Sequence, residues 1–353
     1  LLAESHLAVH TWPERRGVTL DVYVCNFCQD NSAKAERLAT ALIAAFQPAQ
    51  SQTNRILRGN SATAGAGDEL VLEPLSDDAV FGYRSRERLL TRQTGCGQML
   101  EIMETPQFGR VMRLDRRFMT SEREEFFYHE ALVHPAAIAH PAPRRALIIG
   151  GGDGGAAEEL MKHPSIERVV IAELDAEVIE AAKQYLPAVH RDVFADPRLE
   201  VKIGDGFAHL ETTQDRFDLV LFDLTDPDTP AASLYTAASF AKARRVLDPG
   251  GALVLHIGSP IFHPERVQQI VGELRQVFSS VHCYGLYIPL YGAYWGLAIA
   301  SDGLDPTALD ATTVGQRLGE RGIGDLQYYN AAVHGALFAL PNFYRALVSD
   351  PVQ

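Results

Sequence analysis

Hydrophobic and polar residues follow two different periods in the first part of the chain. Residues 7–24 alternate between apolar and polar, which predicts two short strands around a turn at Pro13 to Gly17. In residues 33–46 the apolar side chains recur at spacings of three and four, which predicts a helix with one packing face. These apolar residues are Leu38, Leu42, Ala45 and Phe46. Residues 1–46 are therefore expected to form a small α+β unit.

A polar, glycine- and alanine-rich stretch follows, and it has no sustained period. We interpret residues 47–69 as a linker. Beyond it, residues 97–114 hold two strand-like runs around a Pro-Gln-Phe-Gly turn, and residues 124–139 have a helical pattern. We expect residues 70–135 to form a small β region, which could also supply the interface of a homodimer or a higher homo-oligomer.

From Arg145 onward, short buried strands alternate regularly with helical stretches. The strands read ALIIG, RVVIAEL, LEVKIGD, FDLVLFD and GALVLHI. This alternation is typical of a parallel, doubly wound α/β sheet of the Rossmann-like, methyltransferase type. Two later runs, VHCYGLYIP and YWGLAIAS, have no helix between them and predict a strand hairpin that closes the sheet. We place this domain at residues 136–345.

Composition narrows the class of partner. The 353 residues suffice for about two domains, and the net charge of −13 disfavours nucleic acid and anionic lipid. No apolar run approaches the roughly 18 residues of a membrane span, and we see no secretion signal, so we expect a cytoplasmic protein without a membrane partner. Four cysteines are too few for a disulfide framework, which favours reduced thiols.

The first strand of the predicted sheet runs into the glycine-rich loop Gly150 to Gly155 and then into a helix. Glycines let a ligand approach the backbone and the open N–H groups of the helix. A glycine loop alone is weak evidence, but Glu173 ends the next strand, where a carboxylate can accept both ribose hydroxyls. The combination predicts a nucleoside site.

Further carboxylates end the following strands. Asp205 lies in Gly204-Asp205-Gly206, where it can accept a hydrogen bond from an amine such as that of adenine, and Asp223 ends the fourth strand shortly before Asp226. Taken singly, such residues are most often helix caps or turn residues. Asp153, Glu173, Asp205 and Asp223 gathered at one sheet edge instead predict a positively charged ligand.

Asp153 discriminates between two related nucleosides. S-adenosylmethionine would bring its own carboxylate close to this aspartate, whereas decarboxylated S-adenosylmethionine ends in an ammonium group that pairs with it. Asp223 and Asp226 would then hold a second amine, and Asp223 would accept its proton as the nitrogen attacks the carbon beside the sulfonium. An S-adenosylmethionine-dependent methyltransferase stays open as an alternative, as does a polyamine-binding protein without catalysis.

Residues 97–341 resemble the spermidine synthases, the polyamine aminopropyltransferases. The resemblance is carried by FGRVMRLD, TSEREEFFYHEALVHPA, LIIGGGDGG, AELD, GDG, FDLTDP, SLYT and YYNAAVHGALFALP. It implies transfer of an aminopropyl group from decarboxylated S-adenosylmethionine to putrescine, without a metal or a cofactor, to give spermidine and 5′-methylthioadenosine. The residues that it implies for donor binding are Gln98, Asp153, Glu173, Asp205 and Gly206, with Pro230 lining the nucleoside pocket. Those that it implies on the amine side are Tyr128, His129, Asp226 and Tyr291, with Asp223 as the proton acceptor.

The departures from the family pattern all border the predicted amine pocket. The family usually has Gly and then Gln after Leu-Asp, whereas this chain continues with Arg116, Arg117, Phe118 and Met119. His256 stands where many members have Gln, and Leu290 where Thr is frequent. The acceptor could therefore be putrescine, a longer polyamine or another amine.

The N-terminal text ESHLAVHTWPE, with DVYVC at residues 21–25, resembles bacterial S-adenosylmethionine decarboxylase. The resemblance implies that Ser5 becomes a pyruvoyl group, and that His10 and Cys25 serve self-processing and proton donation. That family has a longer segment before its serine than the four residues that precede Ser5, so we expect a partial decarboxylase-like domain. Alternatively, Cys25 and Cys28 are structural thiols or half of a metal or redox site, and His10 is a core histidine.

Overall fold

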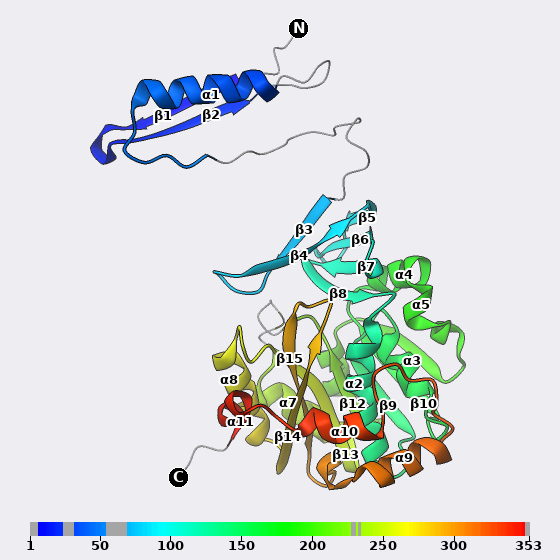
Figure 1. Ribbon diagram of the computed structural model, residues 1–353. Helices are drawn as coiled ribbons and strands as arrows, with labels where there is room; N and C mark the ends of the chain where they lie inside the picture. The colour runs from blue at the N-terminus through cyan, green and yellow to red at the C-terminus, as the bar shows by residue number, and fades with distance from the viewer. Residues whose placement is uncertain (1–5, 24–31, 54–68, 227–230, 232–233, 350–353) are drawn as a thin grey trace. The chain divides into compact units, whose positions relative to one another are not determined.

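The computed structural model describes residues 6–23, 32–53, 69–226, 231 and 234–349, and the chain forms two compact units, 1–67 and 68–353. In the first unit, β1 (His6–Trp12) pairs antiparallel with β2 (Gly17–Tyr23) around the short 3₁₀ helix η1 (Pro13–Arg15), and α1 (Ser32–Phe46) follows. These elements confirm the predicted strands, turn and helix (Figure 1).

The second unit is built on a seven-stranded sheet with the order β11-β10-β9-β12-β13-β15-β14. Its parallel strands are β9 (Arg145–Gly150), β10 (Arg168–Glu173), β11 (Leu199–Ile203), β12 (Phe217–Asp223) and β13 (Leu247–Gly258). The antiparallel hairpin of β14 (Ser280–Ile288) and β15 (Ala293–Ser301) closes one edge. The structure thus confirms the doubly wound sheet and its closing hairpin.

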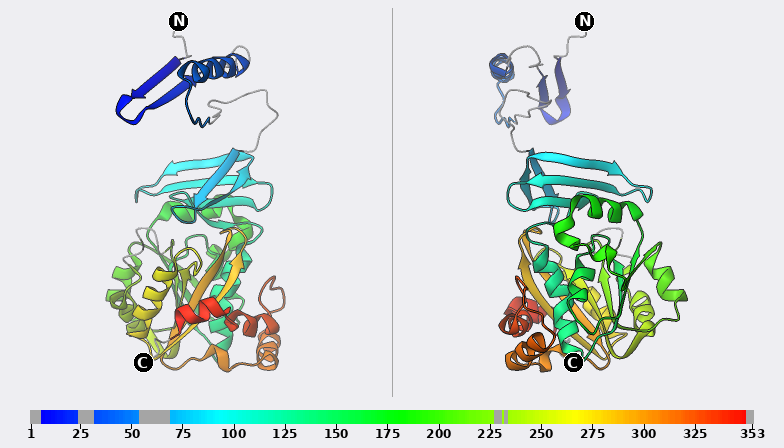
Figure 2. Two further views of the ribbon diagram at one scale, coloured as in Figure 1. Left: turned by 60° about the vertical axis from the view of Figure 1, so that its left-hand side comes forward. Right: turned by 90° about the vertical axis from the view of Figure 1, so that its right-hand side faces the viewer.

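Helices cover both faces of this sheet (Figure 2). One face packs on α2 (Glu125–Ala139), α3 (Gly155–Met161), α9 (Ala311–Glu320) and α10 (Ala331–Phe338). The other packs on α6 (Gly206–Thr212), α7 (Ala237–Val246), α8 (Pro264–Arg275) and α11 (Asn342–Val348). Successive residues of β9 alternate between the two cores, with Ile148 in one and Ile149 in the other. Burial on both faces explains why the strands read as continuous apolar runs.

The region before the main sheet is larger than the predicted hairpin. It contains a four-stranded antiparallel sheet of β5 (Glu87–Gln93), β6 (Met99–Thr105), β7 (Gly109–Leu114) and β8 (Arg117–Ser121). A separate pair is formed by β3 (Glu69–Pro74) and β4 (Val80–Ser85). Leu100 and Ile102 of the four-stranded sheet pack on Val178 and Ala181 of α4 (Ala176–Tyr185), which joins this sheet to the main domain.

Several short elements also belong to the second unit. They are the helix α5 (Pro187–His190) and the 3₁₀ helices η2 (Val193–Ala195) and η4 (Pro306–Ala308). Within the residues that the structure describes, none of the helices combines the length and apolar character needed to cross a bilayer.

Candidate active site

The carboxyl ends of β9 and β12 meet at the glycine-rich loop. Gly150 adopts φ 82°, and a Cβ built there would lie 2.1 Å from the backbone oxygen of Asp223. Only glycine tolerates both this left-handed backbone and this close approach. The N–H of Gly151 then donates to the same Asp223 oxygen at 2.9 Å. The loop sequence therefore fixes where Asp223 stands relative to Asp153.

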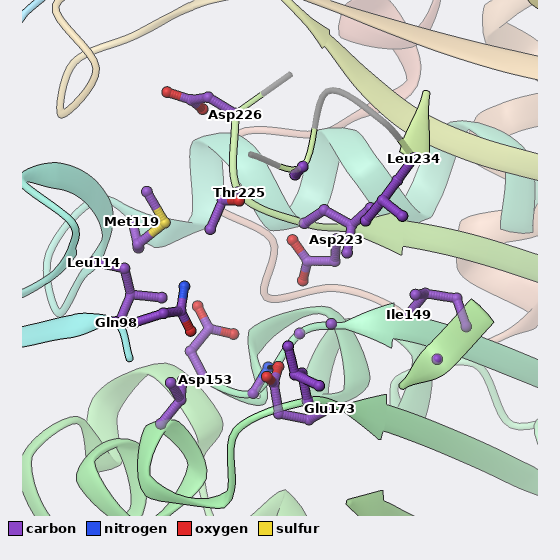
Figure 3. Close-up of a pocket in the computed structure, with 18 of the residues that line it drawn as sticks. Gln98, Leu114, Met119, Ile149, Asp153, Glu173, Asp223, Thr225, Asp226 and Leu234 are labelled. Atoms are coloured by element: carbon purple, nitrogen blue, oxygen red, sulfur yellow. Dashed lines mark hydrogen bonds between the residues drawn. The ribbon is translucent and has the colours of Figure 1, made fainter. Parts of the chain in front are cut away.

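A cavity of about 620 Å³ lies at this edge (Figure 3). Among the residues that line it are ten predicted site residues: Gln98, Tyr128, His129, Asp153, Glu173, Asp205, Gly206, Asp223, Asp226 and Tyr291. Figure 3 shows Glu173 and Asp226 at opposite ends of this group, with Asp153 and Asp223 between them. Pro230, which the sequence also places here, lies outside the described residues.

Asp223 has two chemically different carboxylate oxygens. Its Oδ1 accepts a hydrogen bond from the Tyr128 hydroxyl at 2.9 Å, whereas its buried Oδ2 has no hydrogen-bond partner in the described part of the chain. Burial, together with the neighbouring charge of Asp153, raises the pKa of Asp223 to about 6. Such a carboxylate is ionised at neutral pH and is a better proton acceptor than an exposed aspartate.

Asp153 already has two partners within the protein. Its Oδ1 accepts from the N–H of Gly155 at 3.0 Å, and its Oδ2 lies 3.4 Å from Nε2 of His129. Nδ1 of His129 lies 2.8 Å from Oε2 of Glu125. Burial alone would lower the pKa of His129, but the two flanking carboxylates raise it well above its ordinary value. The free site therefore holds an imidazolium between two carboxylates.

Glu173 and Asp205 are also engaged by the backbone. Glu173 accepts from the N–H of Gly152 at 3.1 Å and from that of Asp175 at 2.9 Å, and burial raises its pKa to about 7. Asp205 caps α6 by accepting from the N–H of Phe207 at 2.8 Å. The interpretation of a strand-end acid as a helix cap therefore holds for Asp205. Each oxygen retains a lone pair for a ligand, because a carboxylate offers about four acceptor positions.

The side of the cavity that the sequence predicts to bind the amine is aromatic. The hydroxyl of Tyr291 donates to the backbone oxygen of Met119 at 2.9 Å, and both residues line the cavity. His256 lines it as well, and its Nε2 lies 2.9 Å from the backbone oxygen of Leu224 while its Nδ1 accepts from the indole N–H of Trp295 at 3.3 Å. Two of the departures from the family pattern, Met119 and His256, thus border the cavity.

Sequence reasoning missed two features of the site. The first is its apolar wall, which includes Ile149, Leu174 and Phe207; the last two directly follow Glu173 and Gly206 in the sequence. The second is Glu125, which precedes His129 by four residues in the predicted helix. That spacing places two side chains on one helix face and could have revealed the pair.

The decarboxylase-like residues lie in the first unit. His10 is exposed on β1 and stacks on Trp12 with a centroid separation of 6.1 Å, so it is not a core histidine. Ser5, Cys25 and Cys28 lie outside the described residues. Cys96 and Cys283 are free thiols, as predicted.

Two protein families match this chain. Residues 125–307 match the family described as spermine/spermidine synthase domain, and residues 1–59 match S-adenosylmethionine decarboxylase. A polyamine aminopropyltransferase of Nitrosomonas europaea is 49% identical over 284 residues, which cover 80% of this chain and 87% of the relative. One of Bacillus mycoides is 36% identical over 271 residues, covering 76% of this chain and 95% of the relative.

Solved structures agree with these relatives. A spermidine synthase in complex with the transition-state analogue AdoDATO has a TM-score of 0.75 and 30% identity, covering 84% of this chain and 98% of its own. The spermidine synthase from Thermotoga maritima has a TM-score of 0.73 and 30% identity, and the match covers 84% of this chain and 97% of that structure's chain.

The sheet, the preceding β region and the cavity define a transferase of the Rossmann-like, methyltransferase-type fold. Within that class, the chain belongs to the spermine/spermidine synthase family, whose relatives above are named polyamine aminopropyltransferases, and it is fused to an S-adenosylmethionine decarboxylase-like segment. The predicted family, fold class and enzyme class are confirmed.

Proposed function

We propose that the protein transfers the aminopropyl group of decarboxylated S-adenosylmethionine to putrescine, giving spermidine and 5′-methylthioadenosine. The observation that carries this proposal is Asp223, whose Oδ2 is buried at the cavity without a partner in the described part of the chain, while Tyr128 holds its Oδ1. A nitrogen nucleophile that must lose a proton needs such a base within reach.

The donor occupies the end of the cavity that holds Glu173 and Asp205. Glu173 receives the ribose hydroxyls, Asp205 receives the adenine amine, and the backbone at Gly206 lets the base lie close to the sheet. The aminopropyl chain extends past Gln98, and its ammonium group pairs with Asp153. Gln98 and Asp153 both line the cavity, which supports a shared contact with that group.

The acceptor enters from the end that holds Asp226 and Tyr291, where its distal ammonium group is attracted by Asp226. Its proximal nitrogen attacks the carbon next to the sulfonium and passes a proton to Asp223 as the carbon–nitrogen bond forms. The carbon–sulfur bond breaks, and its electron pair stays on sulfur. Holding both reactants in one cavity converts a bimolecular reaction into an effectively unimolecular one.

A product assay tests both the chemistry and the acceptor. The purified protein receives decarboxylated S-adenosylmethionine with putrescine, cadaverine, agmatine and spermidine in competition, and products are identified by mass spectrometry. We expect methylthioadenosine with spermidine as the dominant new amine. A different dominant product would assign another acceptor, consistent with Met119 and His256 at the cavity. Methylation by ordinary S-adenosylmethionine without aminopropyl transfer would instead establish a methyltransferase.

For the N-terminal segment we propose conversion of Ser5 to a pyruvoyl group, with His10 and Cys25 assisting. The match of residues 1–59 to S-adenosylmethionine decarboxylase supports this assignment. Peptide mass mapping across Glu4 and Ser5 tests it: a peptide that begins with a pyruvoyl group supports conversion, and an intact Glu4–Ser5 bond in all molecules refutes it.

We also propose that the protein is a homodimer or a higher homo-oligomer through the region before the main sheet. Leu70, Leu72 and Val80 of β3 and β4 are exposed to 58%, 43% and 64% in the single chain, which is unusual for neighbouring apolar side chains. Light scattering should report a multiple of 38.8 kDa for the intact chain and a smaller mass for Leu70→Asp.

A further inference from the structure

A buried carboxylate stands directly behind the donor site without being among the residues that line the cavity. We propose that Glu125 is a positioning residue: by fixing the ring of His129, it holds the Asp153 carboxylate in the orientation that receives the donor's terminal ammonium. This inference rests on the proposed function, in which Asp153 binds that group.

The contacts form one continuous line. Oε2 of Glu125 lies 2.8 Å from Nδ1 of His129, and Nε2 of the same ring lies 3.4 Å from Oδ2 of Asp153. The side chains of Glu125 and His129 are each 2% exposed. With Nδ1–H directed at Glu125, the other ring nitrogen of the imidazolium lies on the opposite side of the ring, within ion-pair distance of Asp153.

The His129 ring has little freedom to move aside. A Cβ built on Gly155 would lie 2.2 Å from the ring, so the ring occupies the space that a side chain at position 155 would fill. The N–H of Gly155 also donates to Oδ1 of Asp153 at 3.0 Å. Gly155 and His129 therefore each secure one oxygen of Asp153, which restricts rotation of its carboxylate.

Glu125 is itself held from the other side. Its Oε1 accepts from Arg191 at 3.2 Å, and Arg191 also donates to Glu158 at 2.8 Å. The Arg191 side chain is 38% exposed, whereas that of Glu125 is 2% exposed. Arg191 therefore places a positive charge at the solvent-facing side of Glu125. A buried carboxylate with charged partners on both sides is fixed in place more firmly than one that is hydrogen-bonded on one side.

The charges around His129 explain why Glu125 matters for protonation. Glu125 faces it from α2 and Glu124 from the position just before that helix. Asp153 faces it from the glycine-rich loop, and Asp223 from β12. The ring of Tyr128 packs edge-on against it at 5.3 Å. In Glu125→Gln the amide oxygen can accept Nδ1–H, but one flanking negative charge is lost. Once neutral, the ring would present the Nε2 lone pair to Asp153 and repel it.

Two measurements on the full chain test the role of Glu125. In protein labelled with ¹⁵N-histidine, the His129 resonance, assigned by its loss in His129→Gln, should titrate about one pH unit lower or more in Glu125→Gln than in the unmodified protein. In steady-state assays, kcat/KM for decarboxylated S-adenosylmethionine is measured for Glu125→Gln and for the unmodified protein. The ratio of the variant's value to that of the unmodified protein should fall about tenfold between pH 6.5 and pH 8.5. If kcat/KM of Glu125→Gln and of the unmodified protein changed with pH in parallel, and the His129 titration were also unchanged, the proposal would be overturned.

Controls separate positioning from general destabilisation. Glu130 lies on the same helix, is 1% exposed and accepts three backbone N–H groups from Gln327, Tyr328 and Tyr329. Glu130→Gln should lower stability but keep the pH profile of the unmodified protein. Arg191→Leu, at a partly exposed site, removes a positive charge beside Glu125. It should therefore move the His129 titration to higher pH, opposite to Glu125→Gln, and it provides the test if Glu125→Gln does not fold.

The titration of His129 also separates this proposal from the proposed function. If the unmodified protein transfers no aminopropyl group, the proposed function fails, while the resonance still reports whether Glu125 controls His129. A shifted resonance with unchanged kinetics would show control of protonation without a role in donor binding, and would overturn the positioning role.

Discussion

At the scale of single residues, the site is distinguished by how differently its carboxylates are engaged. Asp153 and Glu173 have both oxygens engaged and Asp205 has one on a backbone N–H, whereas Asp223 keeps one oxygen without a partner among the described residues. Binding groups benefit from fixed orientation, and a proton acceptor needs a free lone pair. This difference in engagement is the one that the proposed roles require, with Asp223 as the base and the other three carboxylates as binding groups.

Replacing Asp223 by Asn should lower kcat by about 10²–10⁴-fold, because the amide cannot accept the proton. The dissociation constant of decarboxylated S-adenosylmethionine, measured by calorimetry, should change little. Asp218→Asn is the matched control, since Asp218 lies on the same strand and accepts backbone N–H groups of Arg144 and Arg145. Equal turnover in Asp223→Asn and Asp218→Asn would remove Asp223 from its role.

The site residues were predictable to the extent that topology alone positions them. Asp153, Glu173, Asp205 and Asp223 follow parallel strands, and the carboxyl ends of parallel strands share one edge. Their partners were not predictable in this way. The pairing of Asp153 with His129 depends on how α2 packs beside the glycine-rich loop, which no local pattern specifies.

At the scale of elements, the turn between β7 and β8 contains Arg116 in a backbone conformation that is sterically unfavourable for a residue with a side chain. Leu114 pairs with Arg117, so Asp115 and Arg116 form a two-residue turn, and their φ angles are 48° and 71°. Hairpin turns with both φ angles positive favour Asp-Gly, because glycine avoids the steric cost of this backbone. Asp115 fits the turn and also accepts from the N–H of Met99 at 2.8 Å, whereas Arg116 does not fit.

Arg116→Gly should therefore raise the free energy of unfolding by about 0.5–1 kcal/mol, after allowing for the larger entropy that glycine adds to the unfolded chain. Urea denaturation measures this change. Arg116→Ala removes the same side chain but retains the positive φ, so it should give no gain. Equal stabilisation by both substitutions would show that the side chain, and not the backbone, is responsible.

The elements themselves were predicted where burial is two-sided. The runs that became β9, β12 and β13 are mostly apolar because helices cover both faces. The strands β3, β4 and β5 escaped prediction, since they read ELVLEP, VFGYRS and ERLLTRQ, and most of their residues are exposed or half-buried. Partial burial weakens the alternation that identifies a strand.

At the scale of the whole molecule, several buried acids make stability depend on pH. Burial raises the pKa of Glu73 and of Glu124 to about 8, and that of Glu173 to about 7. Each of these carboxyl groups contributes to the free energy of unfolding. The contribution is fully present below the unfolded pKa of 4.5 and is lost as pH rises through the pKa of the folded state. Glu159 acts in the opposite direction: although burial opposes it, His134 and Lys162 lower its pKa to about 2, so its contribution is lost as pH falls from 4.5 to 2.

The free energy of unfolding should thus peak near about pH 5 and fall by several kcal/mol toward pH 8.5, at about 1.4 kcal/mol per unit of pKa shift. Urea denaturation at intervals from pH 4 to pH 9 measures the curve. Glu124→Gln should flatten its alkaline side. A plateau from pH 5 to pH 8 in the unmodified protein would contradict the prediction.

The long-range topology of the second unit also determines when the cavity comes into existence. The central strand β9 pairs with β12, so Ala146 must meet Leu219, and the lining of the cavity runs from Cys96 to Tyr291. Contacts of such sequence separation form late and slowly during folding. A donor analogue has no site to recognise until most of the domain is assembled. It should therefore slow unfolding of the finished protein while leaving the refolding rate unchanged.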